Sequence, residues 1–183
     1  MGLLEDINKL SFIGSEFLLW LWYMSDKNNG LFDVEGFGKF ELWIYDKVKL
    51  EKNADKEKEI LVCSGAFSEL REAKLGLIGG KRITEARLKC IIDEEEWFMT
   101  LDSMFLDLKQ LKTPKVEISK DADEAEKEAM FYEKVFLIEK AISMIDNLFA
   151  SFLNHRLSSG WSEERIAIKR WMSGDEDDSV DQS

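Results

Sequence analysis

The chain has 183 residues, of which 45% are hydrophobic and 11% aromatic, so it is not a disordered chain and can form one domain with its own core. Its net charge of −12 is opposite in sign to the basic balance with which most nucleic-acid-binding proteins meet phosphate. A single proline and few clusters of turn residues indicate long regular elements.

The segment 12–24, FIGSEFLLWLWYM, is the most apolar part of the chain, and every residue from Phe17 to Met24 is apolar or aromatic. A helix without a polar face must be covered on nearly all sides, and this run is shorter than the roughly 18 residues needed to span a bilayer. We therefore predict a central core helix and no contact with a membrane. The alternative is a binding surface built on Trp20, Trp22 and Tyr23.

The next segments favour β-strands. Residues 25–38 carry three glycines and the run DKNNG, which is typical of turns. Residues 40–50 alternate between apolar and polar side chains, as a half-buried strand does. A charged connection over residues 51–59 and an apolar run at residues 60–63 then predict an antiparallel hairpin.

Helical spacing returns at residues 67–78, where Ser68 can cap the start and the glycine pair 79–80 can end the helix. A second predicted hairpin follows, with strands at residues 82–92 and 97–108 and a turn at residues 93–96. The alternation slips near residues 103–106, which indicates a bulge. The inner face of the strand at residues 82–92 is predicted to carry Thr84, Ala86, Leu88, Cys90 and Ile92.

The longest predicted element is a helix over residues 123–157, about 50 Å long at 1.5 Å per residue. One apolar stripe steps alternately by four and three residues, and it consists of Phe131, Val135, Ile138, Ile142, Ile145, Phe149 and Phe152. A second row lies beside it, namely Leu137, Ala141, Met144 and Leu148. One row can serve the domain core and the other a subunit partner, so we expect a homo-oligomer.

A final short helix is predicted from a cap at Ser162 to Trp171, and residues 173–183 are predicted to be a disordered acidic tail. Strands clustered between helices, without βαβ alternation, define an α+β fold. We expect one domain over residues 1–172. Its small antiparallel sheet of about four strands packs on the apolar N-terminal helix and the long C-terminal helix.

The sequence shows no pattern typical of catalysis or metal binding. Cys63 and Cys90 lie inside apolar runs without the spacing of a zinc site, and they are predicted to be buried thiols in a reducing compartment. The lone His155 lacks the convergent partners that a metal or catalytic site needs. The first ten residues do not form a signal-peptide pattern, so we expect a cytoplasmic protein. Because no catalytic motif is found, we also expect that the protein is not an enzyme and uses no cofactor.

One span is basic within this acidic chain. Between residues 71 and 89, only Glu72 and Glu85 oppose six cations, which are Arg71, Lys74, Lys81, Arg82, Arg87 and Lys89. Two interpretations are open for this basic span. It is either an ordinary solvated surface or a patch that contacts phosphate at a helix end and along one strand face.

A series of short motifs runs from residue 12 to residue 171. It consists of FIGSEFLLWLW at 12–22, Glu72-Ala73-Lys74, Gly80-Lys81, Glu85-Ala86-Arg87-Leu88, Trp97 before a strand, and Leu111-Lys112-Thr113-Pro114-Lys115 ahead of a long helix. This order resembles the C-terminal part of longer RdgC-like, recombination-associated proteins. The resemblance implies sequence-independent binding of duplex DNA by a dimeric, ring-like assembly that modulates homologous recombination, without catalysis or a cofactor.

The chain departs from those proteins in its acidic balance and in matching only their C-terminal part. Two hypotheses therefore stand. In the first, the protein binds duplex DNA, alone or in a complex with a separate RdgC-like partner chain. In the second, it is an interaction or scaffold module that acts through its long helix without touching nucleic acid.

Overall fold

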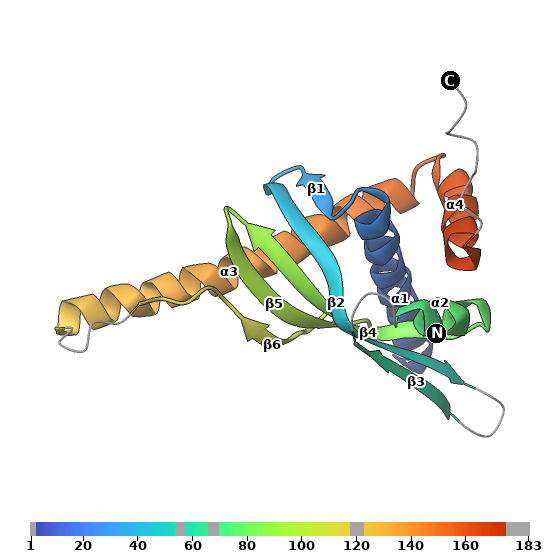
Figure 1. The fold of residues 1–183 in the computed structure, drawn as a ribbon, viewed down its shortest axis with the longest axis horizontal. Helices are drawn as coiled ribbons and strands as arrows, with labels where there is room; N and C mark the ends of the chain where they lie inside the picture. The colour runs from blue at the N-terminus through green and yellow to red at the C-terminus, as the bar shows by residue number, and fades with distance from the viewer. Residues whose placement is uncertain (1–2, 54–57, 66–69, 118–122, 175–183) are drawn as a thin grey trace.

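The computed structural model describes residues 3–53, 58–65, 70–117 and 123–174, and it contains four helices and one antiparallel sheet (Figure 1). The predicted α+β class is confirmed. The elements in chain order are α1 (Leu3–Lys27), β1 (Leu31–Val34), β2 (Gly38–Asn53), β3 (Lys58–Ser64), α2 (Leu70–Ile78), β4 (Arg82–Ile92), β5 (Glu95–Asp102), β6 (Leu108–Lys112), α3 (Glu124–Arg156) and α4 (Trp161–Ser173).

The sheet has six strands, where the sequence predicted about four. Its order is β1-β2-β4-β5-β6, and β3 also pairs with β2. The 16-residue β2 is long enough to pair with β1 near its start and with β3 near its end, both along the edge opposite β4. The two predicted hairpins, β2–β3 and β4–β5, are both present and antiparallel.

The two unpredicted strands are short. β1 lies inside the glycine-rich segment that was expected to be only a turn. The strand predicted over residues 97–108 ends at Asp102, and a turn separates it from β6. The carboxylate of Asp102 accepts hydrogen bonds from the amides of Met104 (2.8 Å) and Phe105 (3.4 Å), and Leu106 has a left-handed φ of 56°. The predicted slip in alternation is therefore a turn that the Asp102 side chain caps.

The alternation predicted for residues 40–50 is confirmed in β2, where the apolar residues on one face are all buried, namely Phe40, Leu42, Ile44, Val48 and Leu50. In β4 the prediction was wrong at one position. Ile83 is 1% exposed and faces the core, whereas Thr84 is only half-buried. The β2–β4 register shifts between Lys49 and Leu50, so one extra residue of β4 changes which side chains point inward.

Helix α1 is the central core helix that the sequence predicted, although it begins at Leu3 and continues to Lys27. It packs against β2 and β4. Six of the seven residues from position 17 to position 23 are at most 6% exposed, namely Phe17, Leu18, Trp20, Leu21, Trp22 and Tyr23. The predicted helix end before β4 is also confirmed, because α2 ends at Ile78 and Gly80 has a φ of 85°. The predicted cap Ser68 lies outside the described residues.

Helix α3 starts at a capping box formed by Asp123 and Glu126, close to its predicted start. Its first half projects beyond the sheet, and its second half packs on the rest of the fold (Figure 1). The buried residues are Leu137, Ala141, Met144, Ile145, Leu148 and Phe152. The second predicted row therefore serves the core, together with the C-terminal end of the first stripe.

The predicted cap of α4 was wrong, because the helix begins at Trp161 and its N-cap is Gly160, which makes no side-chain capping bond. The ring of Trp161 packs edge-on against Phe152 at 5.8 Å, and this contact places the start of α4. The helix ends at Ser173, where Gly174 adopts a left-handed φ of 75°. The rest of the predicted acidic tail lies outside the described residues.

The predicted burial of both cysteines is confirmed, and neither Cys63 nor Cys90 forms a disulfide. Within the described ranges, no helix combines the length and the apolar character needed to cross a membrane.

Candidate functional site

The six cations of the basic span do not form one patch in the structure. They separate into three pairs at three places. Arg71 and Lys74 line a hollow beside α4, and Lys81 and Arg82 line another pocket between α1 and α4. Arg87 and Lys89 belong to β4, whose buried residues point the other way. The pairs separate because they lie on different elements. The first pair belongs to α2, the second follows the turn at Gly80, and the third lies on the outward-facing positions of β4.

The first pair shares its hollow with Asp26 and the rings of Trp22 and Trp171. Lys74 Nζ lies 3.0 Å from Asp26 Oδ2 and 4.0 Å from the centroid of the Trp171 ring. Asp26 also accepts a hydrogen bond from Trp171 Nε1 at 3.0 Å. Lys74 therefore joins α2 to α1 and α4 through a salt bridge and a cation–π contact. Arg71 is exposed and has no ion-pair partner among the described residues.

The second pair follows the turn at Gly80. Lys81 forms an ion pair with Glu59 of β3, and its hydrogen bond to that carboxylate lowers the pKa of Glu59. Arg82 places its guanidinium 5.0 Å from the centroid of the Phe12 ring. The pocket that both residues line also includes Arg165 and Lys169 of α4. Two cations predicted from the sequence therefore meet two others that the sequence analysis did not single out.

The third pair lies on the sheet face turned away from the core, here called the outer sheet face. Arg87 is 3.5 Å from Asp46 and 6.0 Å from the centroid of the Tyr45 ring. Lys89 is 2.6 Å from Glu96 and 5.7 Å from the centroid of the Phe98 ring. Both cations of this pair are thus neutralised by carboxylates and rest on aromatic rings.

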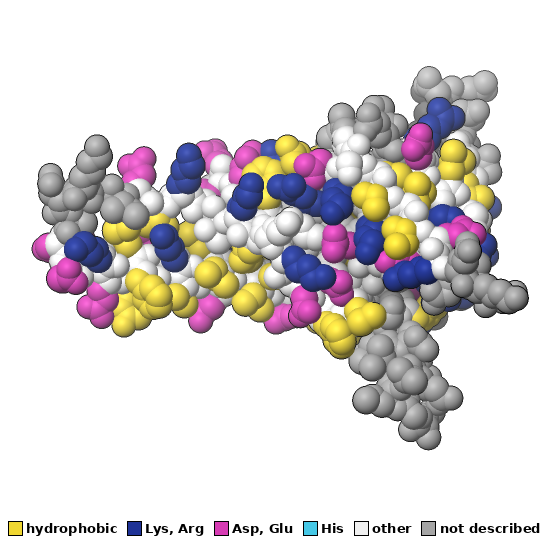
Figure 2. Space-filling model, turned by 90° about the horizontal axis from the view of Figure 1, so that it is seen from below, with side chains coloured by type: hydrophobic (Ala, Val, Ile, Leu, Met, Phe, Trp, Pro, Cys, Tyr) yellow, Lys and Arg dark blue, Asp and Glu magenta, His cyan; other side chains and the backbone are white. Residues whose placement is uncertain are grey.

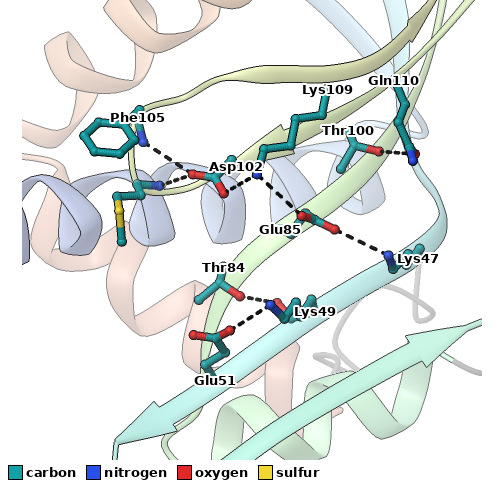
Figure 3. Close-up of polar contacts among 11 residues, drawn as sticks. Lys47, Lys49, Glu51, Thr84, Glu85, Thr100, Asp102, Phe105, Lys109 and Gln110 are labelled. Carbon is teal, nitrogen blue, oxygen red and sulfur yellow. Dashed lines mark hydrogen bonds and ion pairs between the residues drawn. The ribbon is translucent and has the colours of Figure 1, made fainter. Parts of the chain in front are cut away.

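Other ion pairs continue across the outer sheet face (Figure 3). Lys47 and Lys109 approach Glu85 at 3.4 and 3.8 Å, and Lys109 also lies 2.8 Å from Asp102. Burial raises the pKa of Asp102, but hydrogen bonds from Lys109 and from the amide of Met104 outweigh it, so the pKa lies below its ordinary value. These contacts alternate in sign. Figure 2 likewise shows basic and acidic side chains interspersed on one side of the molecule. Such a face offers phosphate no single-sign field.

The most distinctive exposed feature is apolar. Between residues 131 and 142 of α3, five large hydrophobic side chains are between 43% and 63% exposed. We call them the α3 surface: Phe131, Tyr132, Phe136, Ile138 and Ile142. Figure 2 shows hydrophobic side chains gathered at the end of the molecule where α3 projects. Phe131, Ile138 and Ile142 belong to the first apolar stripe predicted from the sequence, whereas Tyr132 and Phe136 belong to neither predicted row.

The described residues contain no group of three or more His, Cys, Asp or Glu side chains that could hold a metal ion. His155 lies 3.6 Å from Glu164 and against the rings of Trp20 and Trp161, at the end of α3. Burial raises the pKa of the Cys90 thiol, which keeps it protonated and unreactive.

Comparison with protein-family models and with curated proteins finds no match to this chain. The α3 surface and the pocket beside Arg82 are thus interpreted from their own chemistry.

Proposed function

We propose that this protein is a non-enzymatic interaction module that self-associates through the α3 surface. The observation that carries this proposal is the exposure of Phe131, Ile138 and Ile142, each between 43% and 63%, on a helix that projects away from its own domain. Monomeric proteins rarely expose contiguous apolar patches of more than a few hundred Å², and larger ones mark interaction sites.

Three residues of the α3 surface, together with the half-buried Val135, have a spacing that favours another helix as their partner. Phe131, Val135, Ile138 and Ile142 step by four, three and four residues, which places them at a and d positions of a heptad. This stripe joins the core at Ile145, so an interface here continues the packing of the domain itself. A second copy of the chain supplies the same stripe and can form a symmetric contact.

The charges beside the stripe favour a parallel arrangement of the two copies. In the same heptad, Lys134 takes a g position and Glu139 an e position. Neither side chain has an ion-pair partner among the described residues, and both are exposed. Across a parallel pair of helices, the g position of one copy faces the e position of the other. Lys134 would then meet Glu139 of the second copy, whereas an antiparallel pair would bring like positions together.

Light scattering at micromolar concentration tests self-association. We expect the mass of a dimer for the natural chain and of a monomer for a Phe131→Glu/Ile138→Glu variant. Both changed positions are exposed, so the fold should be retained. A Leu31→Glu/Ile60→Glu variant makes the same charge change at exposed apolar positions on β1 and β3 and should remain a dimer. A monomeric natural chain would overturn the proposal.

A charge swap tests the orientation. Lys134→Glu and Glu139→Lys should each weaken the dimer, because each places like charges across a parallel interface. The double swap should restore the natural dissociation constant, measured by sedimentation over a dilution series. A double swap as weak as the single variants would exclude the parallel arrangement.

The second candidate function is sequence-independent binding of duplex DNA, alone or in a complex with an RdgC-like partner chain. It is supported by the convergence of Lys81 and Arg82 with Arg165 and Lys169 around one pocket, since cations from distant segments then share one surface. Such cations touch the phosphate backbone and carry no base code. Dimerisation would present this surface twice.

Mobility-shift titrations on duplexes of unrelated sequence test this second candidate. Lys81→Glu/Arg82→Glu should weaken binding, and log affinity should fall with log salt by about 0.9 per phosphate contacted. Arg87→Glu/Lys89→Glu has the same charge change and should bind more nearly like the natural chain, because carboxylates already neutralise both side chains. No binding at low salt would leave self-association as the whole function.

A further inference from the structure

A pocket of about 250 Å³ lies between α1, α2, α4 and the start of β4. Its walls are mainly apolar, with Phe12 and Leu19 from α1, Leu77 from α2, Ile83 from β4, and Ile168 and Met172 from α4. The volume is just under the roughly 300–1,000 Å³ of sites for drug-sized ligands. The pocket therefore suits a small molecule with one extended apolar part.

Exposure distinguishes the floor of the pocket from its mouth. Leu77, Ile83 and Ile168 are at most 9% exposed and form the floor. The lining residues Arg82, Arg165 and Lys169 are exposed and therefore lie at the mouth. An apolar floor beneath a charged mouth is suited to an amphipathic ligand, since each part of such a ligand meets its own kind of surface.

The mouth keeps its positive charge because the other charged residues at the pocket are already paired. Glu16 is held by Arg156 at 2.6 Å, and Lys81 is held by Glu59. Arg82, Arg165 and Lys169 have no ion-pair partner within the part of the chain that the structure describes. In a chain of net charge −12, these three unpaired cations make the rim of the apolar floor locally positive.

We propose that this pocket binds a single-chain amphipathic anion, with its alkyl chain on the apolar floor and its carboxylate between the cations of the mouth. Arg82 is oriented for this role by its contact with the Phe12 ring, and guanidinium groups bind carboxylates through paired hydrogen bonds. The pocket volume favours one medium-length chain over a two-chain lipid. This inference goes beyond self-association, because none of the lining residues belongs to the α3 surface.

Calorimetric titration with decanoate, below the concentration at which it forms micelles, tests the proposal. We expect one site per chain. Acetate, which has the headgroup without the chain, should not bind detectably. Decyltrimethylammonium, which has the chain with the opposite charge, should bind at least about tenfold more weakly. Equal binding of the cationic and anionic detergents would overturn the proposal, because it would indicate apolar adsorption without a charge-selective mouth.

Two variants separate the mouth from the floor. Arg165→Glu/Lys169→Glu should weaken decanoate binding at least about tenfold. Lys112→Glu/Lys115→Glu makes the same charge change away from the pocket and should bind like the natural chain. Leu19→Trp fills the pocket and should abolish decanoate binding while leaving the mass of the protein in light scattering unchanged. If Leu19→Trp does not fold, as judged by circular dichroism, the mouth variant at exposed positions still decides the case.

Two more titrations distinguish decanoate binding in the pocket from decanoate binding at the α3 surface or at a surface that binds membranes. The Phe131→Glu/Ile138→Glu variant should bind decanoate like the natural chain, because neither changed residue lines the pocket. The pocket proposal therefore does not depend on the dimer proposal. Vesicles containing phosphatidylglycerol should not compete with decanoate, because the pocket holds a single chain. Decanoate binding that is lost in this α3 variant, or blocked by the vesicles, would refute the pocket and assign the ligand to an exposed surface.

Discussion

Gly14 of α1 provides a sharp test of how the central helix sits on the sheet. A Cβ atom added at this position would lie 1.9 Å from the carbonyl oxygen of Ser103. An ordinary contact needs about 3.4 Å, so α1 and the turn after β5 would have to separate by about 1.5 Å, the difference between those distances. The turn is held in place, because the amide of Ser103 donates to the carbonyl of Thr84 at 2.9 Å. The helix would therefore have to move.

Gly14→Ala should destabilise the protein despite the better helix propensity of alanine. The propensity gain is about 1 kcal/mol, and overpacking against backbone costs about 3 kcal/mol or more because α1 carries fully buried core side chains. The net loss of about 2 kcal/mol corresponds to a fall of roughly 4–8 °C in melting temperature for a chain of this size. Thermal denaturation followed by circular dichroism measures it.

Gly76 of α2 is the matched control. A Cβ atom there would meet Leu61 Cδ2 at 2.8 Å, which is the end of a flexible side chain and can move aside. Gly76→Ala should therefore leave the melting temperature unchanged or raise it slightly. A Gly14→Ala variant as stable as Gly76→Ala would refute the close packing of α1 on the turn after β5.

Further predictions concern the core, acid stability and thiol reactivity. Trp20→Ala should lower the free energy of unfolding by about 3–5 kcal/mol in urea titrations, because Trp20 is 5% exposed and packs on Phe152. The lowered pKa of Asp102 stabilises the fold when the carboxyl is ionised, and this contribution is lost as the pH falls through the folded-state value. Asp102→Asn should therefore cost stability near pH 7, and its deficit should shrink towards pH 2. Cys90 should react with a thiol reagent only at the rate of unfolding, measured in a Cys63→Ser background.

The helices and strands that could be predicted from the sequence are those whose apolar residues repeat regularly over many positions. The unbroken apolar run after Phe17 leaves a helix no polar face, and the alternation from Phe40 to Leu50 persists across a strand that is half-buried along its length. β1 and β6 have only four and five residues, so neither provides enough repeats to stand out. Both are stabilised by pairing with a longer neighbour, which is a tertiary effect.

The helix α3 shows what periodicity leaves open. Both apolar rows are visible in the sequence, but Ile138 and Leu137 are neighbours in the chain, and each fits the apolar spacing of its own row equally well. Ile138 is 43% exposed and Leu137 is 7% exposed, because the rest of the fold covers only one side of the helix. Which of the two rows is exposed depends on how far the sheet and α1 extend along α3. The order of apolar residues within α3 itself does not contain this information.

The basic span does not form one patch for a related reason. Within the span itself, six cations stand against only two carboxylates. Folding then brought acidic side chains from outside it, so that Asp26 meets Lys74, Asp46 meets Arg87, and Glu96 meets Lys89. The surviving positive region combines Arg82 with cations of α4 that lie about eighty residues further along the chain. An anion is attracted by the positive charge that remains after such neutralisation. We therefore expect an anion to bind at the pocket beside Arg82 and not along the whole basic span.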